Sequence, residues 1–385
     1  MNRTTTTQRS PNLVALFAAT ITGGLLMAAT APAHAENVEL RIATLAPSGS
    51  KWMVELDKGA VEVAKETTKD DKDVIVPGAT PRVTLKYYPG GEQGDEKEFI
   101  TKIGLGQLDG AAITATGLSM IDESIRVLEL PMMFDNVAEF DAVADKMWPL
   151  FQARFEKKGF KLNDRGEVGW IYFLSKSKIE SIADLKSSNT KAWVWTDDSL
   201  VKAMYKQLGV SGVPLGVPGV DPGLTSGAIN AVYGSPLASV ALQWYSKVKF
   251  MTSMPMSYSI GATVLSIKTL NKISPADQKR LAKVAKSLGK GLRKAIRSEN
   301  ESAKKTMLRK GVTLVPTPTA MVDEFRKNAE LVWKNLAGKM YSQEQLDMVL
   351  KYRDEYRAKN PPKGAAAIAP AATATPAVTP AVKAK

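Results

Sequence analysis

The sequence contains no cysteine and only one histidine, His34, which lies in a stretch with the features of a cleavable leader. The rest of the chain therefore lacks a thiol nucleophile, an imidazole general base and the commonest transition-metal ligands. It also lacks disulfides, so packing alone must stabilise the fold. We expect no metal site and no cofactor.

Acidic pairs are the remaining route to hydrolysis in a chain without histidine. Two acidic clusters occur: Asp95, Glu96 and Glu98, and Asp197 with Asp198. Both lie where a helix is expected to begin, and the helix dipole explains negative charge there. Neither a GxSxG elbow nor an SxxK motif is present. We therefore expect no catalytic residue and no enzymatic activity.

The first 35 residues form a pattern typical of a secretory signal peptide. Arg3 and Arg9 provide a basic start, residues 13–29 form an apolar run, and Ala33-His34-Ala35 is a small-residue cleavage site. No later apolar run approaches the roughly 20 residues of a membrane span, so no stable membrane insertion is expected. The formal net charge is +13, and removing Arg3 and Arg9 leaves +11. In an exported protein this excess indicates a solvated lysine-rich surface, and no nucleic-acid partner is expected.

Cleavage after Ala35 is a direct prediction of this pattern. An intact-mass measurement of the exported protein should show a chain that begins at Glu36. A retained N-terminus would contradict the assignment of a cleaved signal.

Strand and helix patterns alternate twice along the chain. Strand-like stretches at 38–47 and 81–91 are each followed by a helix pattern, and the order restarts after Asp164. Such alternation is the signature of a parallel α/β sheet, so two α/β halves in tandem are expected. At the end of the chain, residues 358–385 are rich in Ala and Pro and contain no aromatic residue, which predicts a disordered tail.

The longest predicted element is a helix over residues 274–311. Ser274 is its expected N-cap, Pro275 and Asp277 occupy favoured first-turn positions, and Gly311 provides the stop. At 1.5 Å per residue such a helix would be about 54 Å long. It is therefore expected to run across both halves.

Two aromatic positions stand out in the second half. The segment "KAWVW", residues 191–195, places Trp193 and Trp195 on one face of a strand. That face is either a packed core or the wall of a cleft, since tryptophan suits both. Nearby, a predicted strand ends at Tyr233 and Ser235 follows in "GSP". Open α/β sheets bind ligands at such strand ends, although a plain connecting turn would have the same pattern.

The order of these segments resembles a known family. The stretches "LRIATLAPSGSKW", "YYPGGEQGDEKEFITKIGLGQLDGAAITATG", "LELPMMF", "ESIADLKSSNTKAWVW", "GAINAVYGSP" and "YSIGATVLSIKTLNKISPADQKRL" are together similar to the solute-binding subunit of tripartite ATP-independent periplasmic (TRAP) transporters, the DctP family. The resemblance covers residues 38–345. It implies an α/β two-domain periplasmic solute-binding protein fold, with hinge strands and a long domain-spanning helix.

The resemblance also implies a domain organisation in which both domains are discontinuous. The segments are a signal peptide at 1–35, domain I at 36–171 and 260–299, domain II at 172–259 and 300–357, and the tail at 358–385.

The chain departs from the family at the ligand anchor. Most members bind an organic acid through an arginine in a K-x-R-V-P segment, which forms a bidentate pair with the carboxylate. Here Trp193 stands at the arginine position and Trp195 at that of the proline, while Ile171 or Tyr172 stands where a second arginine would fall. These exchanges imply that Trp193 is on the cleft wall and that the ligand is apolar or amphipathic. Core packing stays open, above all for Trp195.

The predicted ligand-binding residues are Trp193, Trp195, Tyr233, Ser235, Phe173 and Pro47. The resemblance implies a periplasmic protein that delivers a small-molecule ligand to TRAP permease membrane subunits. In this branch it also implies a helical-repeat periplasmic partner. Two alternatives remain: a receptor for a small dicarboxylate-like acid bound without the usual arginine, and an exported binding or sensing module that is not coupled to transport.

Overall fold

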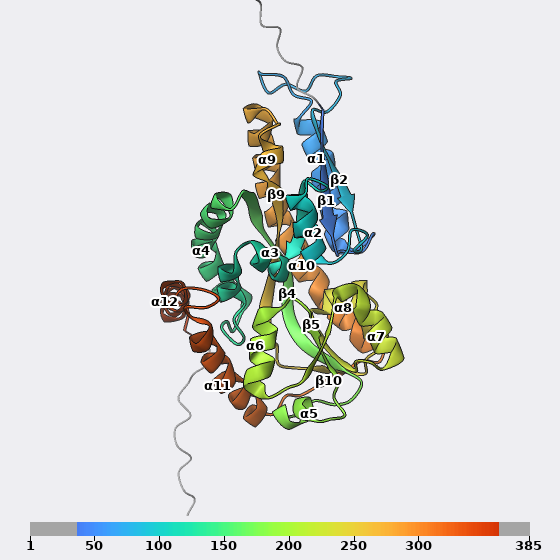
Figure 1. Cartoon of the computed structure of the whole chain (residues 1–385), viewed down its shortest axis with the longest axis vertical. Helices are drawn as coiled ribbons and strands as arrows, with labels where there is room; N and C mark the ends of the chain where they lie inside the picture. The colour runs from blue at the N-terminus through green and yellow to red at the C-terminus, as the bar shows by residue number, and fades with distance from the viewer. Residues whose placement is uncertain (1–36, 362–385) are drawn as a thin grey trace, which may run out of the picture. The chain divides into compact units, whose positions relative to one another are not determined.

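The computed structural model describes residues 37–361, so the predicted signal peptide and the part of the predicted tail beyond residue 361 lie outside the described residues (Figure 1). The strands are β1 (Val38–Thr44), β2 (Val83–Tyr88), β3 (Gly110–Thr114), β4 (Phe160–Ser175), β5 (Ala192–Trp195), β6 (Gly212–Leu215), β7 (Ala231–Gly234), β8 (Phe250–Thr252), β9 (Ser257–Ser266) and β10 (Thr313–Val315).

The α-helices are α1 (Lys51–Glu66), α2 (Glu96–Gly104), α3 (Ala115–Ile121), α4 (Val137–Lys157), α5 (Ile182–Lys186), α6 (Ser199–Leu208), α7 (Val220–Ser226), α8 (Pro236–Ala241), α9 (Ile267–Leu270), α10 (Pro275–Arg309), α11 (Thr319–Leu336) and α12 (Gln343–Lys359). Three 3₁₀ helices accompany them: η1 (Glu123–Glu129), η2 (Val217–Gly219) and η3 (Trp244–Ser246). No helix formed by residues 37–361 is long and apolar enough to cross a membrane.

The strands form one mixed sheet with the order β2-β1-β3-β9-β4-β7-β5-β6, to which β8 and β10 are attached. β1, β2 and β3 are parallel, as are β5, β6 and β7, so each predicted α/β half contributes a parallel group. β9 and β4 join the groups and pair with their neighbours in antiparallel fashion. We refer to β1–β3 with α1–α3 and η1 as the first lobe, and to β5–β7 with α6 and α7 as the second lobe.

Glycine lets the joining strand β9 approach its neighbour β3 closely. A Cβ at Gly261 of β9 would lie 2.8 Å from the carbonyl oxygen of Ile113 in β3, a separation that real Cβ atoms essentially never show. In β4, the register shifts between Glu167 and Gly169, and Gly169 has φ +107°. A bulge with a glycine at positive φ bends a strand locally. The bend lies just before β4 changes its main partner from β9 to β7.

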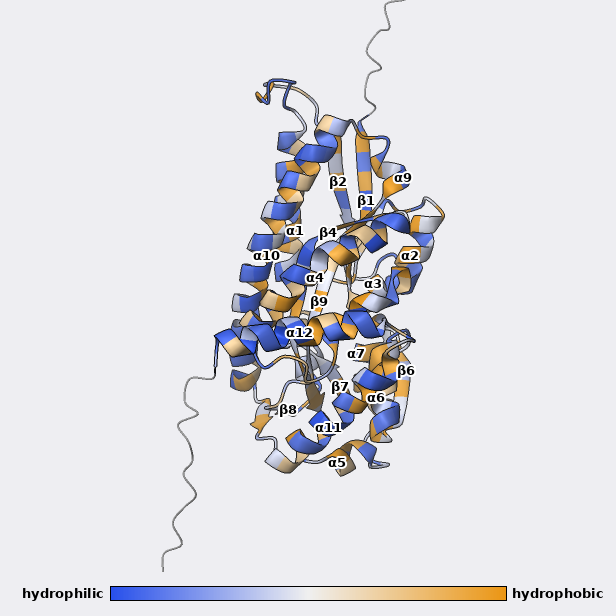
Figure 2. Ribbon diagram, turned by 90° about the vertical axis from the view of Figure 1, so that its left-hand side faces the viewer, coloured by the Kyte–Doolittle hydropathy of each residue, from blue (hydrophilic) through white to orange (hydrophobic). Residues whose placement is uncertain are grey.

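Helix α10 runs along both lobes, as the sequence predicts. It packs against α1 of the first lobe, against β4 and against α8, which follows β7. Its buried residues, which include Leu281, Val284 and Ile296, recur at helical spacing, whereas Lys283 and Lys290 are exposed. Figure 2 shows this alternation of hydrophobic and hydrophilic residues along the helix. The lysines thus form a solvated face.

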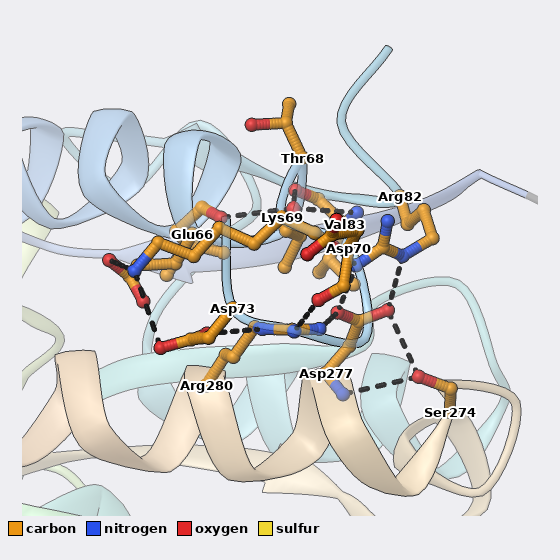
Figure 3. Close-up of polar contacts among 12 residues, drawn as sticks. Glu66, Thr68, Lys69, Asp70, Asp73, Arg82, Val83, Ser274, Asp277 and Arg280 are labelled. Atoms are coloured by element: carbon orange, nitrogen blue, oxygen red, sulfur yellow. Dashed lines mark hydrogen bonds and ion pairs between the residues drawn. The ribbon is translucent and has the colours of Figure 1, made fainter. Parts of the chain in front are cut away.

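The beginning of α10 is fixed to the first lobe by an ion-pair cluster (Figure 3). Asp277 is buried and accepts two hydrogen bonds from Arg82, at 2.7 and 2.8 Å, and one from Arg280 at 2.9 Å. Arg280 also donates to the backbone oxygen of Asp70 at 2.7 Å. The guanidinium of Arg82 helps to hold the pKa of the Asp277 carboxyl below its usual value, although burial works in the opposite direction.

Candidate functional site

A cavity of about 230 Å³ lies between the two lobes. Pro47, which follows β1, and Trp52, at the start of α1, line it from the first lobe. Trp193 of β5 and Tyr233 of β7 line it from the second. Most of the lining is apolar, as is usual for small-molecule sites. Because both lobes contribute walls, a molecule in this cavity would contact both of them.

Trp193 is at the centre of an aromatic stack. Its ring lies 4.6 Å from that of Tyr233 in a stacked arrangement, and 5.5 Å from that of Trp244 in an edge-on arrangement. Its indole N–H donates to the backbone oxygen of Leu215 at 3.0 Å, and only 2% of the residue is exposed. The side chain is therefore both a packed core residue and part of the cavity wall. The two alternatives left open by the sequence do not exclude each other.

Trp195 connects the lobes across the cavity. Its indole N–H donates to Oδ2 of Asp95, the N-cap residue of α2, at 3.0 Å. The backbone N–H of Val217 donates to the same oxygen at 2.9 Å. Burial raises the pKa of the Asp95 carboxyl, although these hydrogen bonds favour its charged form. Asp95 thus holds the second lobe against the first.

Replacing Asp95 with alanine should weaken this closure. Hydrogen bonds to a charged acceptor contribute about 1.5–3 kcal/mol each, and Asp95→Ala removes two of them between the lobes. We expect small-angle scattering to show a larger radius of gyration for ligand-free Asp95→Ala than for the wild type. Asp95→Asn keeps only one of the two acceptor oxygens, which serve the helix cap and the inter-lobe contacts separately, and loses the charge, so its radius should lie between those of the wild type and Asp95→Ala. Equal radii for the wild type and Asp95→Ala would contradict the contact's role in closure.

The other predicted site residues occupy different surroundings. Tyr233, Ser235 and Pro47 line the cavity with the two tryptophans. The Ser235 hydroxyl accepts the backbone N–H of Ala238 at 3.1 Å and so caps α8. Phe173 is not among the lining residues: it is buried in β4, and its ring meets that of Phe325 edge-on at 6.3 Å. The structure thus brings five of the six residues to one cavity and places Phe173 in the core.

A buried polar cluster at one side of the cavity was missed by the sequence reasoning. Arg126 of η1 donates to Asp198 of the second lobe at 2.8 Å and to Thr116 at 2.9 Å. Glu129 lies 3.5 Å from Nε of Arg126, and the Tyr233 hydroxyl donates to Asp198 at 3.3 Å. The sequence feature that could have revealed this cluster is the charged pair Arg126 and Glu129 inside the apolar run "IRVLELPMMF". Asp198 does cap α6, as the helix-dipole argument implies, but it also faces the cavity.

Burial and charge pairing together set the pKa values on this side of the cavity. Burial raises the pKa of Glu96 to about 8, although backbone and hydroxyl donors from Thr114 and Gly117 favour the ionised form. It also raises the pKa of Glu129, against the opposing charge of Arg126. Burial works to lower the pKa of Arg126, but the charges of Asp198 and Glu129 outweigh it and the pKa is raised. Arg126 therefore stays positively charged.

A cavity lined by two α/β lobes has the arrangement of a small-molecule binding cleft. The chain belongs to the DctP family, described as bacterial extracellular solute-binding protein, family 7, whose sequence model matches residues 79–340. This confirms the family suggested by the order of segments.

Solved structures with the same fold include TRAP periplasmic solute-binding proteins. That from Xanthobacter autotrophicus, with bound β-D-galacturonate, has a TM-score of 0.72 and 21% identity, and the match covers 82% of this chain and 99% of that one. The sugar acid binding protein DctPAm from Advenella mimigardefordensis, in complex with galactonate, has a TM-score of 0.75 and 17% identity, with coverage of 83% and 99%. These likenesses confirm the predicted two-domain fold class.

The curated relatives match a smaller part of this chain. An uncharacterized protein of Salmonella typhimurium, YiiZ, is 23% identical over 212 residues, which is 53% of this chain and 62% of that protein. An uncharacterized protein of Haemophilus influenzae is 24% identical over 203 residues, which is 52% of this chain and 61% of that protein. The matches thus span about three fifths of the length of these relatives.

Proposed function

We propose that this protein is the periplasmic solute receptor of a TRAP-type secondary transporter. The observation that carries the proposal is the cavity between the lobes. Residues of both lobes line it, and the hydrogen bonds to Asp95 hold the two lobes together. Delivery to permease membrane subunits follows from the family resemblance, as does a helical-repeat partner. Both partners stay predictions.

Closure on the solute is proposed to occur about the joining strands. The predicted domain boundary between residues 171 and 172 coincides with the point where β4 changes partner, from β9 up to Ile171 to β7 from Tyr172. The bulge at Gly169 lies two residues before it. Strand segments of this kind can absorb the backbone rotation that closes two domains. We therefore propose the predicted discontinuous domains as the two moving bodies.

The solute is proposed to be amphipathic. Trp193, Trp195 and Trp52 present apolar surface, while Arg126 is the only Lys or Arg among the described residues that line the cavity. The solutes named for the two structures above are sugar acids, so the comparisons give no support to a purely apolar ligand. An organic acid paired with Arg126 is accordingly the second candidate.

Native mass spectrometry of the protein after gentle extraction tests the receptor assignment. We expect a small molecule that leaves on unfolding and, when added back, raises the melting temperature and lowers the radius of gyration. Titration of the stripped protein with galacturonate and galactonate tests the second candidate. Retention of no small molecule, together with unchanged melting in every titration, would overturn the proposed function.

A further inference from the structure

The polar side of the cavity is built from three charged side chains that are almost fully buried. Arg126, Glu129 and Asp198 are 3%, 5% and 4% exposed. Arg126 and Glu129 come from the first lobe and Asp198 from the second, so the cluster exists only when the lobes are together. Any solute that reaches this side must interact with these three groups.

The cluster already contains more carboxylates than cations. Asp198 and Glu129 face one guanidinium, which leaves a net charge of −1 when both are ionised. Three further carboxylates line the cavity: Glu96, which accepts hydrogen bonds from Thr114 and Gly117, and Asp164 and Glu167, which pair with arginines outside the lining, Arg293 and Arg297. Both arginines are therefore already paired with a carboxylate, and neither offers a free positive charge to an anionic solute. A solute carboxylate would add an anion that nothing here balances, and an unbalanced buried charge is strongly unfavourable.

One buried donor in the cluster has no acceptor. Nε of Arg126 makes no hydrogen bond to the described residues, and Oε2 of Glu129, at 3.5 Å, lies beyond the usual N–H···O distance. Leaving such a group unsatisfied costs free energy, so a ligand atom that accepts from it would be favoured. An ammonium has no lone pair and cannot do this.

We propose that the solute presents an uncharged hydroxyl group to Arg126, with its apolar body against the tryptophan wall. This inference rests on the proposed function, because it assumes that the cavity is the solute site. A hydroxyl accepts one hydrogen bond from Nε of Arg126 and donates another to Asp198 or Glu129, without changing the net charge. A carboxylate lacks the donor and adds charge, and an ammonium lacks the acceptor. Of these three head groups, only the hydroxyl meets both requirements.

Three matched probes test this inference on the stripped full-length protein. 3-Phenylpropan-1-ol, 3-phenylpropanoate and 3-phenylpropylamine share one apolar body and differ in the head group. In calorimetric titrations at pH 7.5 we expect the alcohol to bind at least tenfold more tightly than the acid and the amine. Tighter binding of the acid or of the amine, or no detectable binding of the alcohol, would overturn the inference.

Variants show whether the charge balance is the cause. Asp198→Asn removes one carboxylate but keeps an acceptor that can cap α6, so binding of the acid should improve at least tenfold relative to that of the alcohol. Glu330→Gln, exposed on α11, is the matched control and should leave all three affinities unchanged. An unchanged preference in Asp198→Asn would overturn the role of the cluster. If the protein retains a solute that is a carboxylic acid, the hydroxyl inference fails and the receptor assignment stands.

Discussion

Trp193→Ala is expected to lower the free energy of unfolding by about 3–5 kcal/mol, the usual range for removing a buried aromatic ring. The ring stacks on Tyr233, meets Trp244 edge-on and donates to Leu215, so truncation opens a void and leaves a carbonyl without its donor. Urea denaturation monitored by circular dichroism measures the change. A loss below about 1 kcal/mol would contradict a core role for this side chain.

Trp193→Phe separates the two roles of this residue. Phenylalanine keeps an aromatic ring in the stack but cannot donate to Leu215, so the loss of stability should be smaller than for alanine.

Because the Trp193 ring also lines the cavity, Trp193→Ala should weaken solute binding as well, by about 1–3 kcal/mol on the scale of apolar burial. Titration with the co-purified solute, below the denaturation midpoint, measures this. Unchanged affinity would restrict Trp193 to packing.

Glu167→Leu is expected to destabilise the protein by about 3–5 kcal/mol, because it removes one partner from a buried ion-pair cluster. The Glu167 carboxylate in β4 accepts from Arg165 at 2.9 Å, from Arg297 of α10 at 2.8 Å and from the Tyr258 hydroxyl of β9 at 2.7 Å. Asp141 of α4 also binds both arginines. The cluster thus ties α10 and α4 to the joining strands, and its loss leaves Arg165 buried with fewer anions.

The surface pair Lys146–Glu355 is the matched control for this prediction. Its side chains are exposed and 2.7 Å apart, so Glu355→Leu should leave the urea midpoint essentially unchanged. Comparable losses in Glu167→Leu and Glu355→Leu would show that burial of the cluster does not matter. A Glu167→Leu protein as stable as the wild type would contradict the prediction directly.

Local interactions determined what the sequence by itself could predict. Helix α10 begins as expected, since the Ser274 hydroxyl accepts the backbone N–H of Asp277 at 3.1 Å, and it ends before Gly311, which has φ +97°. These signals act within one turn of helix, so they can be read from neighbouring residues. The two parallel groups of strands followed from hydropathy patterns for the same reason.

Pairing over long sequence distances decided the rest. The sequence indicates a strand only after Asp164, yet β4 begins at Phe160, because that segment pairs with the end of β9. The partners of this segment are more than 100 residues away in the chain, as in the pair Phe160 and Ser266, and no local pattern encodes that choice. The same applies to the site. Trp195 and Asp95 are 100 residues apart and Arg126 and Asp198 are 72 apart, so only the packing of the two lobes brings each pair together. Only the tertiary structure therefore decides which side chains join the lobes and set the charge of the cavity. The role of a charged or aromatic group depends on its burial and on the groups it contacts, and not on its residue type alone.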